Sequence, residues 1–95
     1  MYEYLLPVGS VVKVTNVVPK LMVIGILQKS KTRTKPYDYL AVAYPEGQFD
    51  QRLNVGFDHD DVEEVVHRGY EDDDRTAFMV ALELTAQKVT QSSEE

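Results

Sequence analysis

The spacing of apolar residues changes once along this chain, near residue 70, and this change limits the folds open to it. Before that point, short β-branched segments alternate apolar and polar residues, which is the period of a strand, or, at residues 21–28, are apolar on both faces, as a central strand would be. After it, residues 72–88 carry Phe78, Ala81, Leu82 and Thr85 at i, i+3, i+4 and i+7, which is the period of a helix. We therefore expect a small sheet followed by one helix.

Five segments have the composition of strands, namely residues 11–17, 21–28, 38–44, 53–57 and 62–70. Their connections are shorter than the crossover of about a dozen residues that parallel neighbours need, so we expect antiparallel pairs. Gly25 predicts a bulge or bend, and Leu53, Val55 and Phe57 are expected to face the core. The expected class is α+β: a small curved antiparallel sheet or partly open barrel of about five strands, with a C-terminal helix that covers its open face.

The chain is long enough for one core and too short for two, with 95 residues of which 43% are hydrophobic. We expect a single domain at residues 1–90 and a disordered tail at residues 91–95, QSSEE. The chain has no cysteine, which excludes a disulfide framework, a thiolate zinc site and a cysteine nucleophile.

The longest apolar run, residues 21–27, is far shorter than the ~20 residues that cross a bilayer. The N-terminus carries Glu3 and no basic residue ahead of its short apolar patch, which is the wrong polarity for a secretory signal. We therefore expect a cytoplasmic protein without a membrane partner.

Charge is divided unevenly along the chain. Residues 1–57 carry seven Lys/Arg against four acids, whereas residues 58–95 carry three against twelve, which gives +3 and −9. Such asymmetry favours an oriented encounter with a charged partner.

The stretch GFDHDDVEEV, residues 56–65, places one histidine among five carboxylates. A metal site needs more ligands that converge, and strand geometry does not bring the other histidine, His67, to His59. The stretch also lacks the glycine and the distant glutamate of an EF-hand loop. Asp58 and Asp61 instead have the spacing of a capping box around one helical turn. We favour a turn that shapes the backbone over a metal or acid/base site.

The loop at residues 29–36, KSKTRTKP, carries four basic residues and precedes Tyr37 and Tyr39. Small β-barrels with basic, aromatic loops bind single-stranded nucleic acid. The chain as a whole is acidic, however, with pI near 4.8, so its carboxylates would repel phosphate. We favour a solvated hairpin loop whose charges protect a sheet edge from aggregation.

Catalytic motifs are not found in the sequence. Ser10 follows Gly9 without the surroundings of a nucleophile elbow, and no glycine-rich phosphate cradle is present. Carboxylates by themselves do not indicate catalysis in a chain with sixteen acids. We expect no enzymatic activity, no metal and no cofactor.

Several motifs occur in an order and spacing that resembles one protein family: LLPVGSVV, LMVIGILQ, PYDYLAVAYPEG and FDHDDVEEVVHRGY, then an acidic opening to the last helix. The resemblance covers about residues 5–84, and YDYLAVAYPEG followed by HDDVEEVVHRGY is its most specific part. The family consists of small proteins of unknown function encoded beside LXG polymorphic toxins of the type VII secretion system in Gram-positive bacteria.

The resemblance implies a non-catalytic accessory role, as a cytosolic chaperone or adaptor that binds a cognate secreted LXG toxin before export. Such a role needs an adhesive surface, for which aromatic and apolar side chains supply most of the energy. The candidate contact residues are Tyr37, Tyr39, Tyr44, Phe78, Leu82 and Val89. Because alternation puts Tyr39 and Tyr44 on opposite faces of their strand, we expect at least one of them in the core.

Two alternatives to the chaperone or adaptor role remain open. An immunity protein would neutralise the active domain of the toxin. A nucleic-acid-binding small β-barrel, which we consider the weaker alternative, would use the basic loop at residues 29–36.

Overall fold

The computed structural model describes the backbone of residues 2–93 and the side chains of residues 2–85. It shows a five-stranded antiparallel sheet that does not close, followed by one helix, which confirms the expected α+β class. The elements are β1 (Val11–Val14), β2 (Lys20–Gln28), β3 (Tyr37–Tyr44), β4 (Val55–Phe57), β5 (Val62–His67) and α1 (Asp73–Ser93). The 3₁₀ turns Gln51–Leu53 and His59–Asp61 lie on either side of β4.

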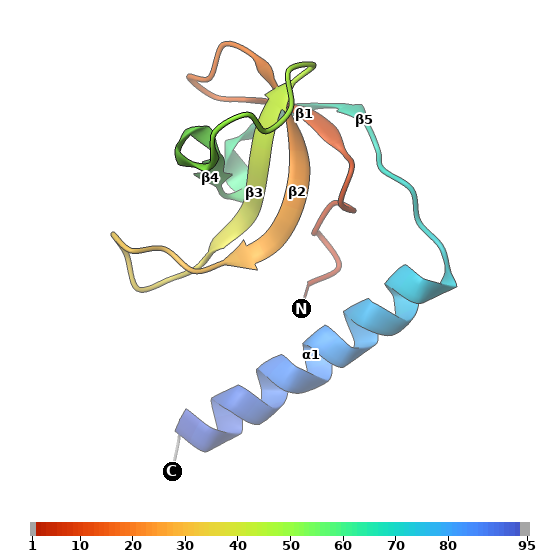
Figure 1. The fold of residues 1–95 in the computed structure, drawn as a ribbon. Coiled ribbons are helices and arrows are strands. Elements are labelled where there is room, and N and C mark those ends of the chain that lie inside the picture. Colours follow the sequence, from red (N-terminus) through yellow and green to blue (C-terminus); the bar gives the residue numbers. More distant parts are fainter. Residues whose placement is uncertain (1, 94–95) are drawn as a thin grey trace.

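The strands follow the order β4-β3-β2-β1-β5, so the last strand returns to pair with the first. Figure 1 shows that the sheet curves strongly and that β2 bends along its length. The register between β2 and β3 shifts between Val23 and Gly25, which confirms the irregularity predicted at this glycine. The two edges of the sheet are the short β4 and the outer strand β5.

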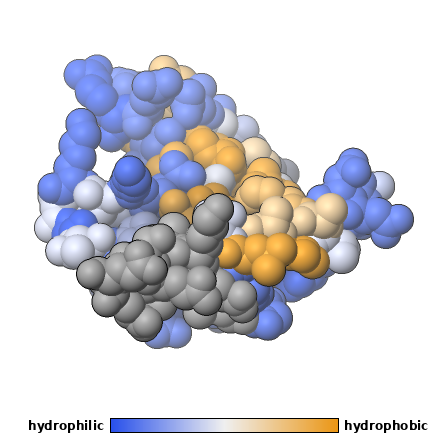
Figure 2. Space-filling model, turned by 90° about the horizontal axis from the view of Figure 1, so that it is seen from below, coloured by the Kyte–Doolittle hydropathy of each residue, from blue (hydrophilic) through white to orange (hydrophobic). Residues whose placement is uncertain are grey.

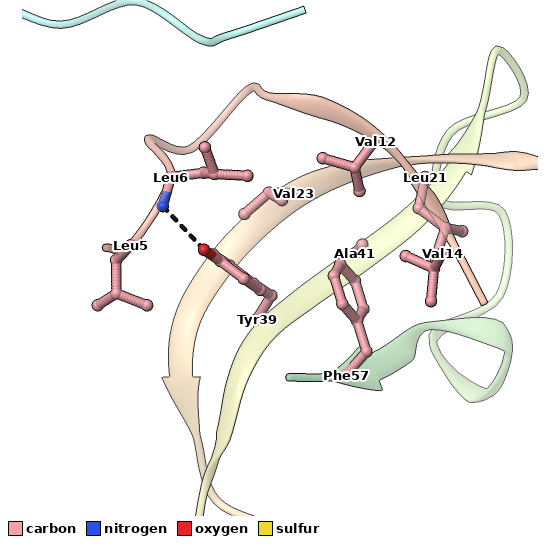
Figure 3. Close-up of a cluster of buried hydrophobic side chains, with 9 residues drawn as sticks. All are labelled: Leu5, Leu6, Val12, Val14, Leu21, Val23, Tyr39, Ala41 and Phe57. Carbon is pink, nitrogen blue, oxygen red and sulfur yellow. Dashed lines mark hydrogen bonds between the residues drawn. The ribbon is translucent and has the colours of Figure 1, made fainter. Parts of the chain in front are cut away.

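The core lies on the concave side of the sheet and includes residues from outside the strands. Its members are Leu5, Leu6, Val12, Val14, Leu21, Val23, Tyr39, Ala41 and Phe57 (Figure 3). The alternation predicted for β1 is confirmed, because Val12 and Val14 are buried while Lys13 between them is exposed. The rings of Tyr39 and Phe57 pack with their centroids 5.3 Å apart.

The N-terminal segment and the residues just after β5 meet in a tight backbone crossing. Gly69 donates its N–H to the buried hydroxyl of Ser10 at 2.9 Å. A Cβ atom at residue 69 would lie 2.6 Å from the carbonyl oxygen of Val8, which is too close for any residue with a side chain. The crossing therefore needs a glycine at this position.

The start of β4 differs from the prediction. Leu53, expected to face the core, is 57% exposed and belongs to the turn before the strand. Asp50 caps that turn by accepting the N–H of Arg52 at 3.0 Å. Local hydrogen bonds to an aspartate have thus prevailed over the alternating pattern.

Helix α1 also differs from the prediction, both in length and in the side that faces the body. It extends to Ser93, so it includes residues 91–93, which we expected in the tail; residues 94–95 lie outside the described part of the chain. The predicted inward stripe is wrong except for Leu82, because Phe78, Ala81 and Thr85 are exposed. The half-buried side chains are those of Arg75, Met79, Leu82 and Glu83.

The helix does not cover the sheet as we had expected. Figure 1 shows α1 as a rod below the sheet, with the N-terminal segment between the two. No side chain of residues 73–85 is fully buried. The radius of gyration is accordingly 14.2 Å, compared with about 12 Å for a compact chain of this length.

Candidate protein-binding surface

The acidic stretch between β4 and β5 forms the predicted turn. Asp58 and Asp61 make a capping box around His59–Asp61, in which the N–H of Asp58 donates to Oδ2 of Asp61 at 3.1 Å. The prediction that these residues shape the backbone is confirmed. Among the residues that the structure describes, no group of three or more His, Asp and Glu could hold a metal ion.

Arg33 connects the basic loop to this turn. Its guanidinium donates to both carboxylate oxygens of Asp58, at 2.8 and 2.7 Å, and lies 3.9 Å from the centre of the Tyr37 ring. These hydrogen bonds hold the pKa of Asp58 below its usual value and raise the pKa of Arg33. The central cation of the loop is therefore committed to a contact within the protein.

Asp38 of β3 is a buried carboxylate that ties three segments together. Its Oδ1 accepts the hydroxyl of Tyr4 at 2.9 Å, and its Oδ2 accepts the N–H of His59 at 2.9 Å. Its own N–H donates to Asp58 at 3.2 Å. Burial, together with the hydrogen bond to Asp38, raises the pKa of Tyr4 to about 12. Asp38 thus fixes the N-terminal segment and the acidic turn to the sheet.

The side chain of His59 belongs to the same network. Its Nδ1 lies 2.7 Å from the hydroxyl of Tyr39, which already accepts the N–H of Leu6 at 2.9 Å (Figure 3 shows the latter bond). Tyr39 is fully buried, so its hydroxyl proton needs an acceptor. Nδ1 of His59 can accept this proton in the tautomer that carries its own proton on Nε2.

Helix α1 carries a surface of another kind. Phe78, Val80 and Leu84 are 52%, 56% and 61% exposed. Val80 and Leu84 lie on one side of the helix, and Phe78 lies on another. Figure 2, which views the molecule from below, shows apolar atoms gathered over its middle beside the grey end of the chain. Large apolar side chains are thus uncovered on more than one side of α1.

The helix is attached mainly through its first three turns. One guanidinium N–H group of Arg75 donates to the carbonyl oxygen of Leu5 at 2.8 Å, and another donates to the Glu71 carboxylate at 3.1 Å. Glu71 also accepts from Arg68. This hydrogen bond, together with the positive charges of Arg68 and Arg75, lowers the pKa of Glu71. Met79 and Leu82 pack against the core.

Two grooves run along α1, one on each side of the attached residues. The wide groove, of about 510 Å³, lies between α1 and the connection from β5, and its apolar floor is Met79, Val80 and Leu84. Polar side chains around this floor are Glu3, Arg68, Glu71, Arg75, Thr76 and Glu83. The narrow groove, of about 280 Å³, lies between α1 and the N-terminal segment, and Val8, Tyr70 and Phe78 are exposed around it.

The structure separates the tyrosines proposed as contacts. Tyr39 is in the core, where a partner could not reach it without opening the sheet. Tyr37 is half-buried between Arg33 and Gly56, where a Cβ on the glycine would lie 2.6 Å from the ring. Tyr44, at the end of β3, is 47% exposed. Of the three, Tyr44 is the most accessible.

The candidates on the helix are closer together. Phe78 lines the narrow groove, and Leu82 is half-buried against the core. The side chain of Val89 lies outside the described residues. The sequence prediction missed Val80 and Leu84, although their i, i+4 spacing on a helix with apolar residues on all sides could have indicated them.

In the described part of the chain, no helix combines the length and apolar character needed to cross a membrane.

Comparisons with curated proteins and with solved structures find no match. Residues 5–78, the sheet and the beginning of α1, match the model of a family described as a domain of unknown function, DUF4176, and the chain belongs to this family.

Proposed function

We propose that this chain is a non-catalytic chaperone or adaptor that binds a cognate LXG-type toxin for type VII secretion. The identity of the partner comes from the resemblance of its ordered motifs to proteins encoded beside such toxins. Membership of a family of unknown function is compatible with this role. The structural observation that carries the proposal is the uncovered apolar surface of α1.

Exposure of this apolar surface to water is unfavourable in free energy when the chain has no partner. Three large apolar side chains on one helix are more than half exposed. Covering what remains exposed of each would stabilise the complex by about 1 kcal/mol per side chain. A helix attached at one end, with apolar residues on several sides, is suited to binding a partner that supplies the missing contacts.

The extent of the family match also supports a binding role for α1. The match ends at residue 78, whereas Val80 and Leu84 lie beyond it. A surface that distinguishes one toxin from another is expected outside the part of the fold that the family shares.

Co-expression with the toxin encoded beside this chain tests the proposal. The full-length toxin and its N-terminal and C-terminal halves would each be produced with the chain and analysed by pull-down and size exclusion, with an LXG toxin from another locus as the control. We expect co-elution with the cognate toxin and not with the control. No co-elution with any form of the cognate toxin would refute the proposal.

The half that binds distinguishes the roles. Co-elution with the N-terminal half supports an export adaptor. Co-elution with the C-terminal half, together with rescue of growth when the toxin is expressed, would replace the adaptor role by immunity.

A further inference from the structure

We propose, on the basis of the function proposed above, that the wide groove of α1 takes an amphipathic helix of the partner, apolar on the docking side and basic along its flanks. Residues Met79, Val80 and Leu84 form the apolar floor on which such a helix would pack.

The shape of the groove favours a helix over a strand. Two rows of side chains at i, i+4 spacing run along this side of α1, one through Arg75, Met79 and Glu83 and the other through Thr76, Val80 and Leu84. The space between two such rows is where the side-chain ridge of a second helix packs. A strand would need backbone groups to pair with, but the backbone hydrogen bonds within α1 are made along the helix itself.

The length of the groove fits two turns of a partner helix. Residues 76–84 rise by about 12 Å along the axis of α1. An occupant of this length presents two or three apolar side chains on one face, at i, i+3 or i+4, and i+7. These match the apolar floor of the groove, which consists of three side chains.

Charge favours basic flanks on the partner helix. Three carboxylates, Glu3, Glu71 and Glu83, and the two guanidiniums of Arg68 and Arg75 line the wide groove. Three more acids lie at the start of α1, with Asp72 just before the helix, Asp73 on its first turn, and Asp74 on its first turn at the narrow groove. These eight side chains sum to a charge of −4. The helix dipole stabilises acids at the start of α1 but does not remove their charge. Lysine or arginine beside the docking face would therefore be attracted, and acids repelled.

The same charges argue against a second copy of this chain as the occupant. Pairing α1 with α1 would bring two strongly acidic surfaces together, because residues 71–85 contain five acids and one arginine. Repulsion between like charges across an interface opposes association. A partner with the opposite charge removes this penalty.

Two synthetic peptides test the inference directly. Both are 20-residue helices with the same leucine stripe, one with lysine flanks and the other with glutamate flanks, and binding to the full chain is measured by fluorescence anisotropy. We expect the lysine peptide to bind at least about tenfold more tightly than the glutamate peptide. Equal affinities would overturn the assignment of a basic partner.

The double variant Val80→Asp, Leu84→Asp tests the location. Its added carboxylates attract the lysine flanks, so a loss of affinity has to come from the apolar floor. We expect a loss of about tenfold or more for the lysine peptide, with helicity checked by circular dichroism. Leu53→Asp is the matched control, since Leu53 is 57% exposed at a site distant from α1 and should bind like the wild type. Unchanged affinity of the double variant would overturn the location.

Repeating the toxin pull-down with the same variants separates this inference from the proposed function. If the wild type and the double variant retain the toxin equally, the groove is not the docking site, although the adaptor role stands. If neither form retains the toxin, but the double variant still binds the lysine peptide more weakly than the wild type, the proposed toxin-binding function is refuted. The assignment of the groove as a site for a basic helix then stands. A wild-type dimer that the double variant dissociates would overturn the inference in favour of a second copy.

Discussion

Two acidic stretches of similar composition, DHDD at residues 58–61 and EDDD at residues 71–74, have different surroundings in this molecule. In the first, Asp58 is held by Arg33 and by the capping box with Asp61, beside the buried Asp38. In the second, Glu71 and Asp72 accept hydrogen bonds from Arg75, which is only three or four residues away. Asp73 and Asp74 are exposed at the start of a helix with uncovered apolar side chains.

The comparison shows that local composition does not determine what an acidic stretch does. The first stretch lies against the core, so its hydrogen bonds support the sheet. The second lies at the end of the sheet domain, where its charge is presented to the surroundings. Changes near the first should lower stability, and changes near the second should alter binding with little effect on stability.

The largest loss of stability is expected at the crossing between the two regions. In Gly69→Ala the new methyl group would meet the backbone of Val8 and Ser10, which cannot move aside as a flexible side chain would. We expect the free energy of unfolding, from chemical denaturation, to fall by about 2–3 kcal/mol. Gly25→Ala is the control, because the nearest atom there is the end of the Gln28 side chain at 3.1 Å. Equal losses in both variants would contradict the tight crossing.

A smaller loss is expected from Tyr39→Phe, which removes the hydroxyl that joins Leu6 to His59. The N–H of Leu6 would be left without an acceptor in the core, which should cost about 1–2 kcal/mol in the free energy of unfolding. Tyr44→Phe is the control, since the Tyr44 side chain is half exposed, and we expect almost no change. In wild-type protein, nitrogen NMR should also show His59 protonated at Nε2; protonation at Nδ1 would contradict the assigned network.

The ion pair between Arg33 and Asp58 should make stability depend on acid pH. Arg33 lowers the pKa of Asp58 in the folded state, so the stabilisation is complete above the unfolded pKa and is lost as pH falls through the folded pKa, below about pH 4. Asp58→Asn keeps the size and capping ability of the side chain and should cost about 1 kcal/mol at pH 7. We expect its deficit relative to wild type to shrink below pH 4 in denaturation series. A deficit that is constant with pH would exclude the ion pair as its cause.

The sheet could be predicted from the sequence because its signals are local. Alternation in β1, β-branched residues in β2 and turn residues between strands each specify structure within a few neighbouring positions. The Asp58–Asp61 turn was predictable for the same reason. The inward orientation of Leu53 was predicted wrongly, because the cap from Asp50 competes with alternation.

The candidate surface depended on contacts that sequence spacing does not reveal. Apolar residues occur on all sides of α1, so periodicity alone gave no reliable inward face. That face is fixed by the bond from Arg75 to the carbonyl of Leu5, seventy positions earlier in the chain. The hydrogen-bond network around Asp38 was also not predicted, because the residues near Asp38 in the sequence do not indicate that Tyr4 and His59 are its partners.

The smallest change in stability is expected from Asp73→Asn, the counterpart of Asp58→Asn in the second acidic stretch. Asp73 is exposed at the first residue of α1, where the helix dipole is the main source of stabilisation, so the free energy of unfolding at pH 7 should change by less than about 0.5 kcal/mol. If Asp73 attracts the basic flank of a partner, the same variant should bind the lysine peptide about twofold more weakly at low salt, a difference that screening removes. Denaturation and anisotropy on the two variants, side by side, check both halves of this expectation. An exposed carboxylate that only attracts a partner makes no contact within the folded chain, so its replacement should leave the free energy of unfolding almost unchanged. If Asp73→Asn instead lowered this free energy as much as Asp58→Asn does, both acidic stretches would support the fold.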